Sequence, residues 1–158
     1  MLGINPAMPM MSPHLVALMA GLVGTTLMLG FLYLLAYGRA VESRLPVALG
    51  MLATRRMEGV LGIGLSLHYF FGIVWGYVYT HLIVLATPES GAATVFLGVT
   101  MGLVHGIFAT MFMIGLADRH PMKSFRESPV ASSLAHGVAH LVYGLGVGLT
   151  VLALGRPA

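Results

Sequence analysis

Four long apolar stretches alternate with short polar or charged segments along the chain. The stretches cover residues 14–37, 60–86, 93–116 and 130–154. Each one exceeds the roughly 20 apolar residues that an α-helix needs to cross the hydrocarbon layer of a bilayer. The pattern therefore predicts an all-α, polytopic membrane protein with four transmembrane helices, in which residues 1–158 form a single transmembrane domain.

A shorter apolar segment, residues 45–54, lies between the first and second stretches. It reads LPVALGMLAT, begins around Pro46 and is followed by Arg55 and Arg56. Its length is only about half of what a span requires. We expect a short interfacial helix on the cytoplasmic surface, with a re-entrant loop as the alternative.

Composition supports the membrane assignment. Of the 158 residues, 58% are hydrophobic and only 8% are charged, and the mean hydropathy is +0.92. So apolar a chain is not a soluble domain. The absence of cysteine excludes thiolate metal sites, disulfides and covalent c-type haem attachment. The first 13 residues hold three prolines and no lysine or arginine, unlike a signal peptide, so we expect the first helix to remain in the mature protein.

Basic residues are concentrated in two of the loops. Seven of the eight lie between the first and second spans or between the third and fourth, namely Arg39, Arg44, Arg55, Arg56, Arg119, Lys123 and Arg126. Cytoplasmic loops carry the excess of Lys and Arg in membrane proteins. We therefore expect both termini and the turn TPESGA on the outer side. Arginines beside spans are usually topology signals, so we expect no binding to nucleic acid despite the net charge of +3.

Histidines occur inside three of the predicted spans, where ionisable side chains are costly and usually functional. His68, His105 and His140 each lie about eleven residues inward from the basic boundary, or roughly 16 Å at about 1.5 Å per residue. This depth is about half of the hydrocarbon thickness. His136 lies one turn from His140 on the same helix face. The four residues predict a histidine layer in the middle of the membrane.

Such a layer is suited to holding a cofactor. The leading ligand pair for a b-type haem or another metal is His68 with His140, with His105 as a substitute and His136 as a further candidate. A proton relay and axial ligation of a pigment are alternatives. No carboxylate accompanies the rings within the spans, which argues against a proton-coupled pump. The structural alternative is that each ring only bonds a neighbouring helix and cements the packing.

One motif occurs twice in the chain. The spelling H-x-x-(aromatic)-G-x-x-x-G covers residues 68–76 and residues 140–148. It favours two helical-hairpin repeats, which would run parallel and be related by an axis along the membrane normal. Chance similarity between glycine-rich spans is the alternative.

The loop ADRHPMKSFRESP contains a further histidine, His120. The loop is polar and lies beyond the third span. We expect His120 to be a solvated side chain.

Several of these features together resemble a known group of proteins. They are the repeated motif of the second span, the G-x-x-x-G of residues 102–106 with the DRHP exit of the third, and AHLVYG in the fourth. The chain resembles small four-helix bacterial inner-membrane proteins of unknown function, the YagU-like kind. The resemblance implies the same topology and a bacterial inner-membrane location, and it supplies no reaction or catalytic residue.

Three classes of function follow. We expect first a non-catalytic subunit of a larger bacterial membrane complex, for example an energy-transducing one, packed against other subunits or as a homo-oligomer. Small residues on several helix faces favour it, since Gly62 and Gly76 lie on different faces from Gly64 and Gly72. An electron carrier using the histidine layer and a small oligomeric transporter or channel are the alternatives. No Ser-His-Asp set, P-loop or HExxH motif occurs in the sequence, so we expect no enzyme.

The distribution of Lys and Arg generates a topology prediction. A reporter that is active only in the cytoplasm should stay inactive when fused after Ala158, and should be active when fused after Lys123. Strong activity of the fusion after Ala158 would reverse the orientation.

Overall fold

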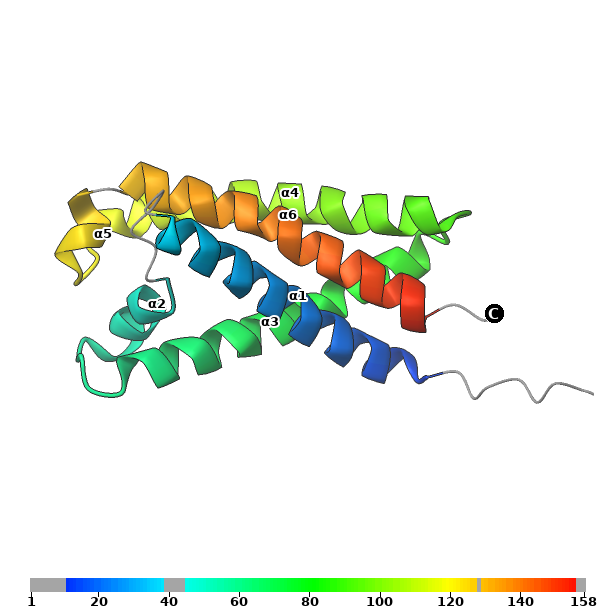
Figure 1. Cartoon of the computed structure of the whole chain (residues 1–158), viewed down its shortest axis with the longest axis horizontal. Helices are drawn as coiled ribbons and strands as arrows, with labels where there is room; N and C mark the ends of the chain where they lie inside the picture. Colours follow the sequence, from blue (N-terminus) through cyan, green and yellow to red (C-terminus); the bar gives the residue numbers. More distant parts are fainter. Residues whose placement is uncertain (1–10, 39–44, 128, 156–158) are drawn as a thin grey trace, which may run out of the picture.

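The computed structural model describes residues 11–38, 45–127 and 129–155, and within them the chain is entirely helical apart from turns and caps. Four long helices are joined by two short ones (Figure 1). In chain order they are α1 (Pro13–Tyr37), α2 (Leu45–Thr54), α3 (Val60–Leu85), α4 (Gly91–Ala117), α5 (Lys123–Glu127) and α6 (Pro129–Leu154). The four long helices are each long and apolar enough to cross a membrane, which confirms the predicted fold class.

Local signals explain where the helices begin. Ser12 caps α1, and its hydroxyl accepts a hydrogen bond from the Leu15 backbone N–H at 3.3 Å. Ser90 caps α4 in the same way, with the Ala93 N–H at 3.1 Å, so α4 begins two residues earlier than the apolar pattern indicated. Gly59 precedes α3 with φ of +66°, a left-handed conformation that glycine adopts without strain. The predicted cap of α6, Ser128, lies outside the described residues.

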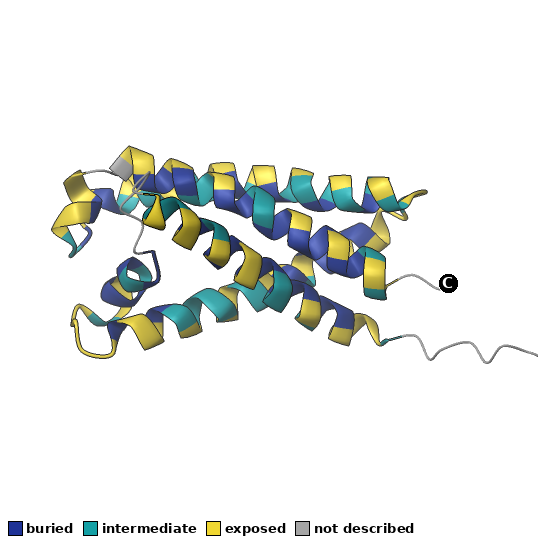
Figure 2. Cartoon of the chain, viewed as in Figure 1, coloured by how far each residue is buried: buried dark blue, intermediate teal, exposed yellow. Residues whose placement is uncertain are grey.

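The four long helices form an asymmetric bundle. α1 and α6 pack on each other in the middle, α3 packs on α1, and α4 packs on α6, whereas α3 and α4 barely touch (Figure 1). Half of the most apolar window of α1 and of α6 is buried, against 17% for α3 and for α4 (Figure 2). α1 and α6 therefore form the core, and α3 and α4 diverge from each other.

Glycines provide the close contacts within each pair of long helices, which we call the first hairpin (α1 and α3) and the second hairpin (α4 and α6). In the first hairpin, a Cβ on Gly76 would meet the backbone of Gly21, and a Cβ on Gly72 would meet the Thr25 side chain. In the second hairpin, a Cβ on Gly144 would meet the Gly98 carbonyl oxygen. Because lipid is as apolar as the side chains it surrounds, close backbone approach of this kind is a main source of helix association in membranes.

The two copies of the repeated motif make similar contacts within their own hairpins, but the packing between the two hairpins differs. Its glycines face the preceding long helix in both halves, Gly72 toward α1 and Gly144 toward α4. Its aromatic residues differ, since Tyr143 is 3% exposed and Phe71 is 49% exposed. The contact between α1 and α6 has no counterpart of similar extent between α3 and α4. The packing between the halves therefore departs from the symmetric arrangement that the repeat favoured.

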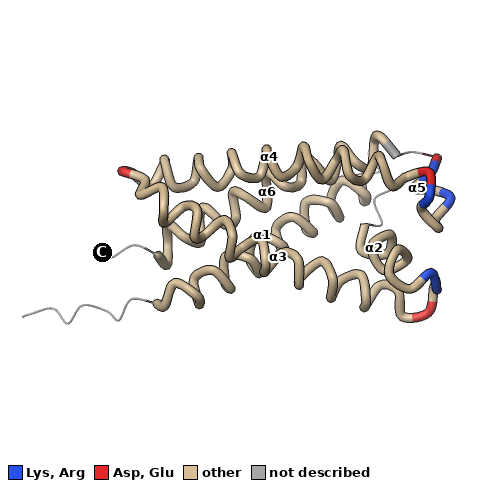
Figure 3. Tube along the Cα trace, turned by 180° about the vertical axis from the view of Figure 1, so that it is seen from behind, with Lys and Arg blue, Asp and Glu red and all other residues tan. Residues whose placement is uncertain are grey.

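All described Lys and Arg residues lie at one end of the bundle, near α2 and α5 (Figure 3). Arg39, Arg44 and Arg156 lie outside the described residues. Glu89 in the turn between α3 and α4 lies at the opposite end. The arrangement agrees with the two basic loops facing the same side of a membrane; which side that is stays a prediction.

The short helix α2 is folded against the basic end of the bundle. It runs beside the first turns of α3, where a Cβ on Gly64 would meet the Pro46 carbonyl oxygen and a Cβ on Gly50 would meet that of Val60. Leu45 is 8% exposed and joins the main apolar core. The predicted short helix is thus present with the expected bounds, and one side of it closes the interior of the bundle rather than facing lipid or water.

The glycine contacts predict a position-dependent effect of adding one methyl group. Gly144→Ala should lower the free energy of unfolding by about 1–3 kcal/mol, because the new Cβ meets backbone atoms of α4 that have no room to move. Gly115→Ala places its Cβ in open space, and should be neutral or slightly stabilising, since alanine favours helix more than glycine does. Thermal unfolding in mild detergent measures both. Equal midpoints for the two variants would contradict the tight packing of α4 on α6.

Candidate functional site

The four predicted histidines form one connected cluster that spans three helices. The ring centroids of His105 on α4 and His140 on α6 are 4.3 Å apart, and those of His140 and His136 are 4.5 Å apart. His68 on α3 joins through His136, at 6.3 Å. The structure therefore brings together all four side chains that the sequence singled out, with His136 between His68 and His140.

Hydrogen bonds fix the orientation of two of the rings. The Tyr79 hydroxyl donates to the Met101 carbonyl at 2.9 Å and lies 3.2 Å from Nδ1 of His105. Since that hydroxyl proton is already used, Nδ1 of His105 carries a hydrogen and donates to the tyrosine oxygen, which leaves Nε2 as an acceptor. Nδ1 of His140 likewise donates to the His136 carbonyl, at 2.9 Å. His105 and His140 are thus anchored as oriented neutral rings.

The other two histidines each retain a ring nitrogen without a protein partner. Nε2 of His68 and Nδ1 of His136 are buried and make no hydrogen bond. A buried polar atom left in this way costs roughly 1–3 kcal/mol relative to one that is paired. His68 and His136 are therefore rings of the cluster with a buried nitrogen that the protein leaves unpaired.

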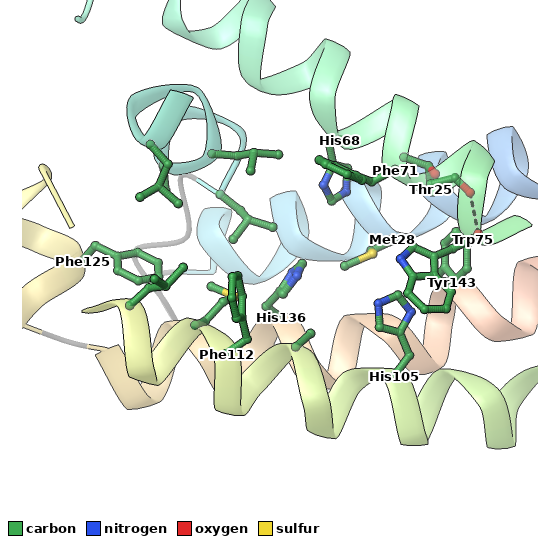
Figure 4. Close-up of a pocket in the computed structure, with 18 of the residues that line it drawn as sticks. Thr25, Met28, His68, Phe71, Trp75, His105, Phe112, Phe125, His136 and Tyr143 are labelled. Atoms are coloured by element: carbon green, nitrogen blue, oxygen red, sulfur yellow. Dashed lines mark hydrogen bonds between the residues drawn. The ribbon is translucent and has the colours of Figure 1, made fainter. Parts of the chain in front are cut away.

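Both unpartnered nitrogens belong to residues that line a cavity of about 280 Å³. Figure 4 shows the His68 ring reaching into this cavity from α3 and the His136 ring reaching into it from the opposite side. Aromatic, aliphatic and thioether side chains supply most of the remaining wall. Among them are Met28, Leu45, Leu49, Phe71, Trp75, Phe112, Met113, Phe125 and Tyr143. We call this space the histidine cavity.

A second and more open cavity continues from the first between α3 and α4. Its volume is about 590 Å³, and it shares Trp75, His105, Ala109 and Phe112 with the histidine cavity. Its other lining residues are Val78, Tyr79, Leu82, Thr100, Met101, Val104 and Phe108. We call it the α3–α4 groove. It exists because the two helices diverge, and it connects the histidines with the lipid-facing side of the bundle.

The geometry bears on the predicted ligand pair. His140 is 6% exposed, does not line the histidine cavity and has its Nδ1 committed to a carbonyl. His136 faces His68 directly, so within a His68-based pair the arrangement favours His136 over His140. Among the described residues, no group of three or more His, Asp or Glu side chains is placed to hold a metal ion. A haem or metal at His68, His105, His136 or His140 stays a prediction.

Sequence reasoning missed several residues of the site. Aromatic residues near the end of a span are ordinarily anchors at the membrane interface, so the sequence did not single out Trp75 or Tyr79. Trp75 nevertheless lies 4.3 Å from His105 between ring centroids, and Tyr79 hydrogen-bonds it. Tyr143 donates to the Gly72 carbonyl at 2.6 Å and so ties α6 to α3 beside the cavity. The spacing of Tyr79 carried no signal that separated it from ordinary interface aromatics. Tyr143 is the aromatic residue of the repeated motif, but the motif did not indicate its contact with Gly72.

His120 corrects another expectation. Its side chain is 1% exposed rather than solvated. Its Nε2 donates to the Ala48 carbonyl of α2 at 3.2 Å, and its Nδ1 accepts from the Met122 N–H at 3.1 Å. Its ring packs on Phe125, with centroids 4.4 Å apart. The loop folds back because this imidazole satisfies two backbone groups at once, and the residue closes the basic end of the histidine cavity.

Comparison with known proteins adds no assignment. The chain matches no protein-family model, no curated protein and no solved structure. The resemblance to YagU-like proteins stays a prediction.

The environment of His120 generates a prediction about pH. Burial, joined by the charge of Arg126, lowers the pKa of His120 below its ordinary value of 6.5, although the hydrogen bond that Nε2 donates to Ala48 opposes the shift. The unfolded chain therefore takes up a proton at higher pH than the folded chain, so the stabilisation by His120 is present above about pH 6.5 and is lost as the pH falls below it.

We expect His120→Gln to lower the thermal midpoint at about pH 8 by more than at about pH 5.5. The matched control is His81→Gln on the exposed surface, which should change the midpoint little at either pH. A deficit of His120→Gln that is equal at both pH values would show that protonation of this imidazole does not contribute.

Proposed function

We propose that the protein is a non-catalytic integral membrane protein that binds a lipid-soluble ligand in the histidine cavity. The observation that carries the proposal is that the rings of His68 and His136 line an otherwise apolar cavity, and that each ring keeps a buried nitrogen, His68 Nε2 or His136 Nδ1, without a protein partner. Most buried polar side-chain atoms in proteins are paired. The buried Thr80 and Ser133 hydroxyls also lack a partner here, but only His68 and His136 among these residues line the cavity. A ligand with hydrogen-bonding or metal-ligating groups supplies the missing partner.

The walls of the cavity specify a neutral ligand. Among the described residues that line the histidine cavity and the α3–α4 groove, none is Lys, Arg, Asp or Glu. A charged head group buried there would lose its hydration without gaining a counter-ion. Neutral imidazoles, by contrast, donate and accept hydrogen bonds without net charge. The site therefore suits an uncharged molecule that already partitions into the membrane.

Access from the lipid supports the same proposal. The α3–α4 groove opens where α3 and α4 diverge, and Phe108 and Phe112 along it are 65% and 67% exposed. A lipid-soluble molecule approaching from the bilayer reaches His105 and then His68 and His136 through this opening. The opposite end is lined by α2, His120 and Phe125.

A larger complex is a further part of the proposal, with the protein as a non-catalytic subunit in a bacterial inner membrane. The glycines no longer support it, because Gly64, Gly72 and Gly76 pack inside the chain and only Gly62 of that set faces open space. Its remaining support is the shallow burial of α3 and α4, whose flanks leave room for a partner helix or a second copy. A ligand-holding subunit and a ligand-holding homo-oligomer both agree with the site.

One observation favours a metal-containing ligand as a second candidate. The ring centroids of His68 and His136 are 6.3 Å apart. A metal ion bound between two imidazoles, with metal–nitrogen bonds of about 2.0–2.1 Å, would separate the two ring centroids by a similar distance. Met28 lines the same cavity with a soft thioether. A metal or a neutral macrocycle held by His68 and His136 would make the protein an electron carrier.

The test is the content of the purified protein. After solubilisation in mild detergent, we expect organic extraction and mass spectrometry to find one apolar molecule in near-stoichiometric amount. His68→Ala combined with His136→Ala should reduce it several-fold, because the double variant removes both unpartnered nitrogens. His81→Ala, exposed and remote from the cavity, is the matched control and should retain it.

Absorption spectra and metal analysis of the same samples distinguish the two candidates. A visible chromophore or bound metal that the double variant loses would favour the electron carrier. Identical bulk phospholipid in the parent protein and the double variant, with nothing else bound, would defeat ligand binding altogether.

A further inference from the structure

The two cavities together describe the shape of the ligand more closely than either one alone. The histidine cavity, of about 280 Å³, has four histidines in its lining, and the α3–α4 groove is larger, at about 590 Å³, and mostly apolar. They meet at Trp75, His105, Ala109 and Phe112. A molecule that filled both would have a small head with hydrogen-bonding groups and a long apolar tail.

The head-group contacts favour a flat ring. Phe71, Trp75, Phe112, Phe125 and Tyr143 line the histidine cavity from different helices. Aromatic rings pack well against another planar ring in offset-stacked or edge-to-face arrangements. Such a wall is of little use to a flexible alcohol or an acyl ester. It indicates a planar, neutral head.

The histidines favour a head group that can present either hydrogen-bond acceptors or hydrogen-bond donors. Either nitrogen of a neutral imidazole can carry the hydrogen, so the rings of His68 and His136, which line the cavity, can each donate to a carbonyl oxygen or accept from a hydroxyl. The anchored His105 presents its Nε2 as an acceptor, by the hydrogen-bond pattern described above. A quinone offers two carbonyl acceptors and its quinol offers two hydroxyl donors, and this set of rings accommodates both.

The groove suits the tail. It is lined along α3 by Val78 and Leu82 and along α4 by Val104 and Phe108, and it runs from the histidines toward the turn between α3 and α4. Its lining contains few polar groups, and it is open to lipid along its length. A prenyl chain could lie in it with its far end in the bilayer.

We propose that the ligand is a prenylated quinone or its quinol, with the ring in the histidine cavity and the tail in the α3–α4 groove. This inference rests on the proposed function and narrows it to one chemical class. It concerns binding only, so no electron or proton transfer is part of it.

The chain itself provides the probe for this inference. Trp75 is its single tryptophan and lines both cavities. A quinone ring bound beside an indole quenches its fluorescence. Titration of the full chain in lipid nanodiscs with decylubiquinone should therefore give saturable quenching. Phytol, an isoprenoid alcohol without a quinone ring, should neither quench nor compete at equal concentration.

Variants separate the head from the tail. His68→Leu combined with His136→Leu should weaken decylubiquinone binding about tenfold, the loss expected for two hydrogen bonds. His81→Leu should bind as the parent does. Ala109→Leu narrows the junction of the two cavities, so it should weaken decylubiquinone while leaving the tailless duroquinone unchanged. The Ala109→Leu variant also tests the inference if the double histidine variant does not fold.

The outcomes distinguish this inference from the proposed function. If phytol competes as well as decylubiquinone, and both need the two histidines, the ligand is a neutral prenyl amphiphile and the quinone assignment fails while the proposed function stands. If quenching is unsaturable and equal in all variants, quinone binding is overturned. If extraction of the purified protein also yields only bulk phospholipid, the proposed function fails with it. Equal weakening of decylubiquinone and duroquinone by Ala109→Leu would overturn the placement of the tail.

Discussion

Close backbone contact at glycine is the interaction on which this structure depends. Inside a bilayer, apolar side chains gain little by leaving lipid for protein, so helices associate where their backbones approach and van der Waals contact is dense. Gly98 and Gly144 bring α4 and α6 together, Gly21 and Gly76 bring α1 and α3 together, and Gly24 and Gly146 bring α1 and α6 together. Three such contacts define a bundle with two core helices and two outer ones. Among the glycines that the structure describes, none brings α3 against α4 in this way, and the two helices diverge.

That divergence explains the site. In a symmetric bundle, Phe71 would be buried as Tyr143 is, and the space between the halves would be filled with side chains. Here Phe71 instead lines an apolar cavity, and the histidines form part of its wall. Two rings are held by Tyr79 and by the His136 carbonyl, and two keep a free nitrogen. Those free nitrogens are polar atoms that the fold leaves unpaired at an energetic cost, on side chains that line the cavity.

The two ends of the histidine cavity differ in structure. Toward the basic loops, α2 folds against α3, and His120 joins α2 to the loop after α4 through two backbone hydrogen bonds. Toward the lipid, the groove between α3 and α4 stays open. The histidine cavity is thus lined by α2 and His120 on one side and continues into the groove on the other. Under the proposed function, the ligand enters from the bilayer through this groove.

Much of the architecture follows from the sequence, because membrane spans are determined by length, apolarity and caps that lie close together along the chain. The predicted ends of the long helices agree with the structure within two residues, and the segment 45–54 is a helix with those bounds. The histidines of the site could also be predicted from the sequence, since ionisable rings inside spans are costly wherever they occur. Which of these side chains lie close together in space could not be predicted from the sequence. His136 and His140 lie one turn apart on the same helix, and only the crossing of α1, α3 and α6 decides that His136 faces His68. His120 read as a loop residue, and only the docking of α2 buries it. Such facts depend on the angles at which helices meet, and those angles are set by contacts between residues as far apart as Gly24 and Gly146, which no local pattern encodes.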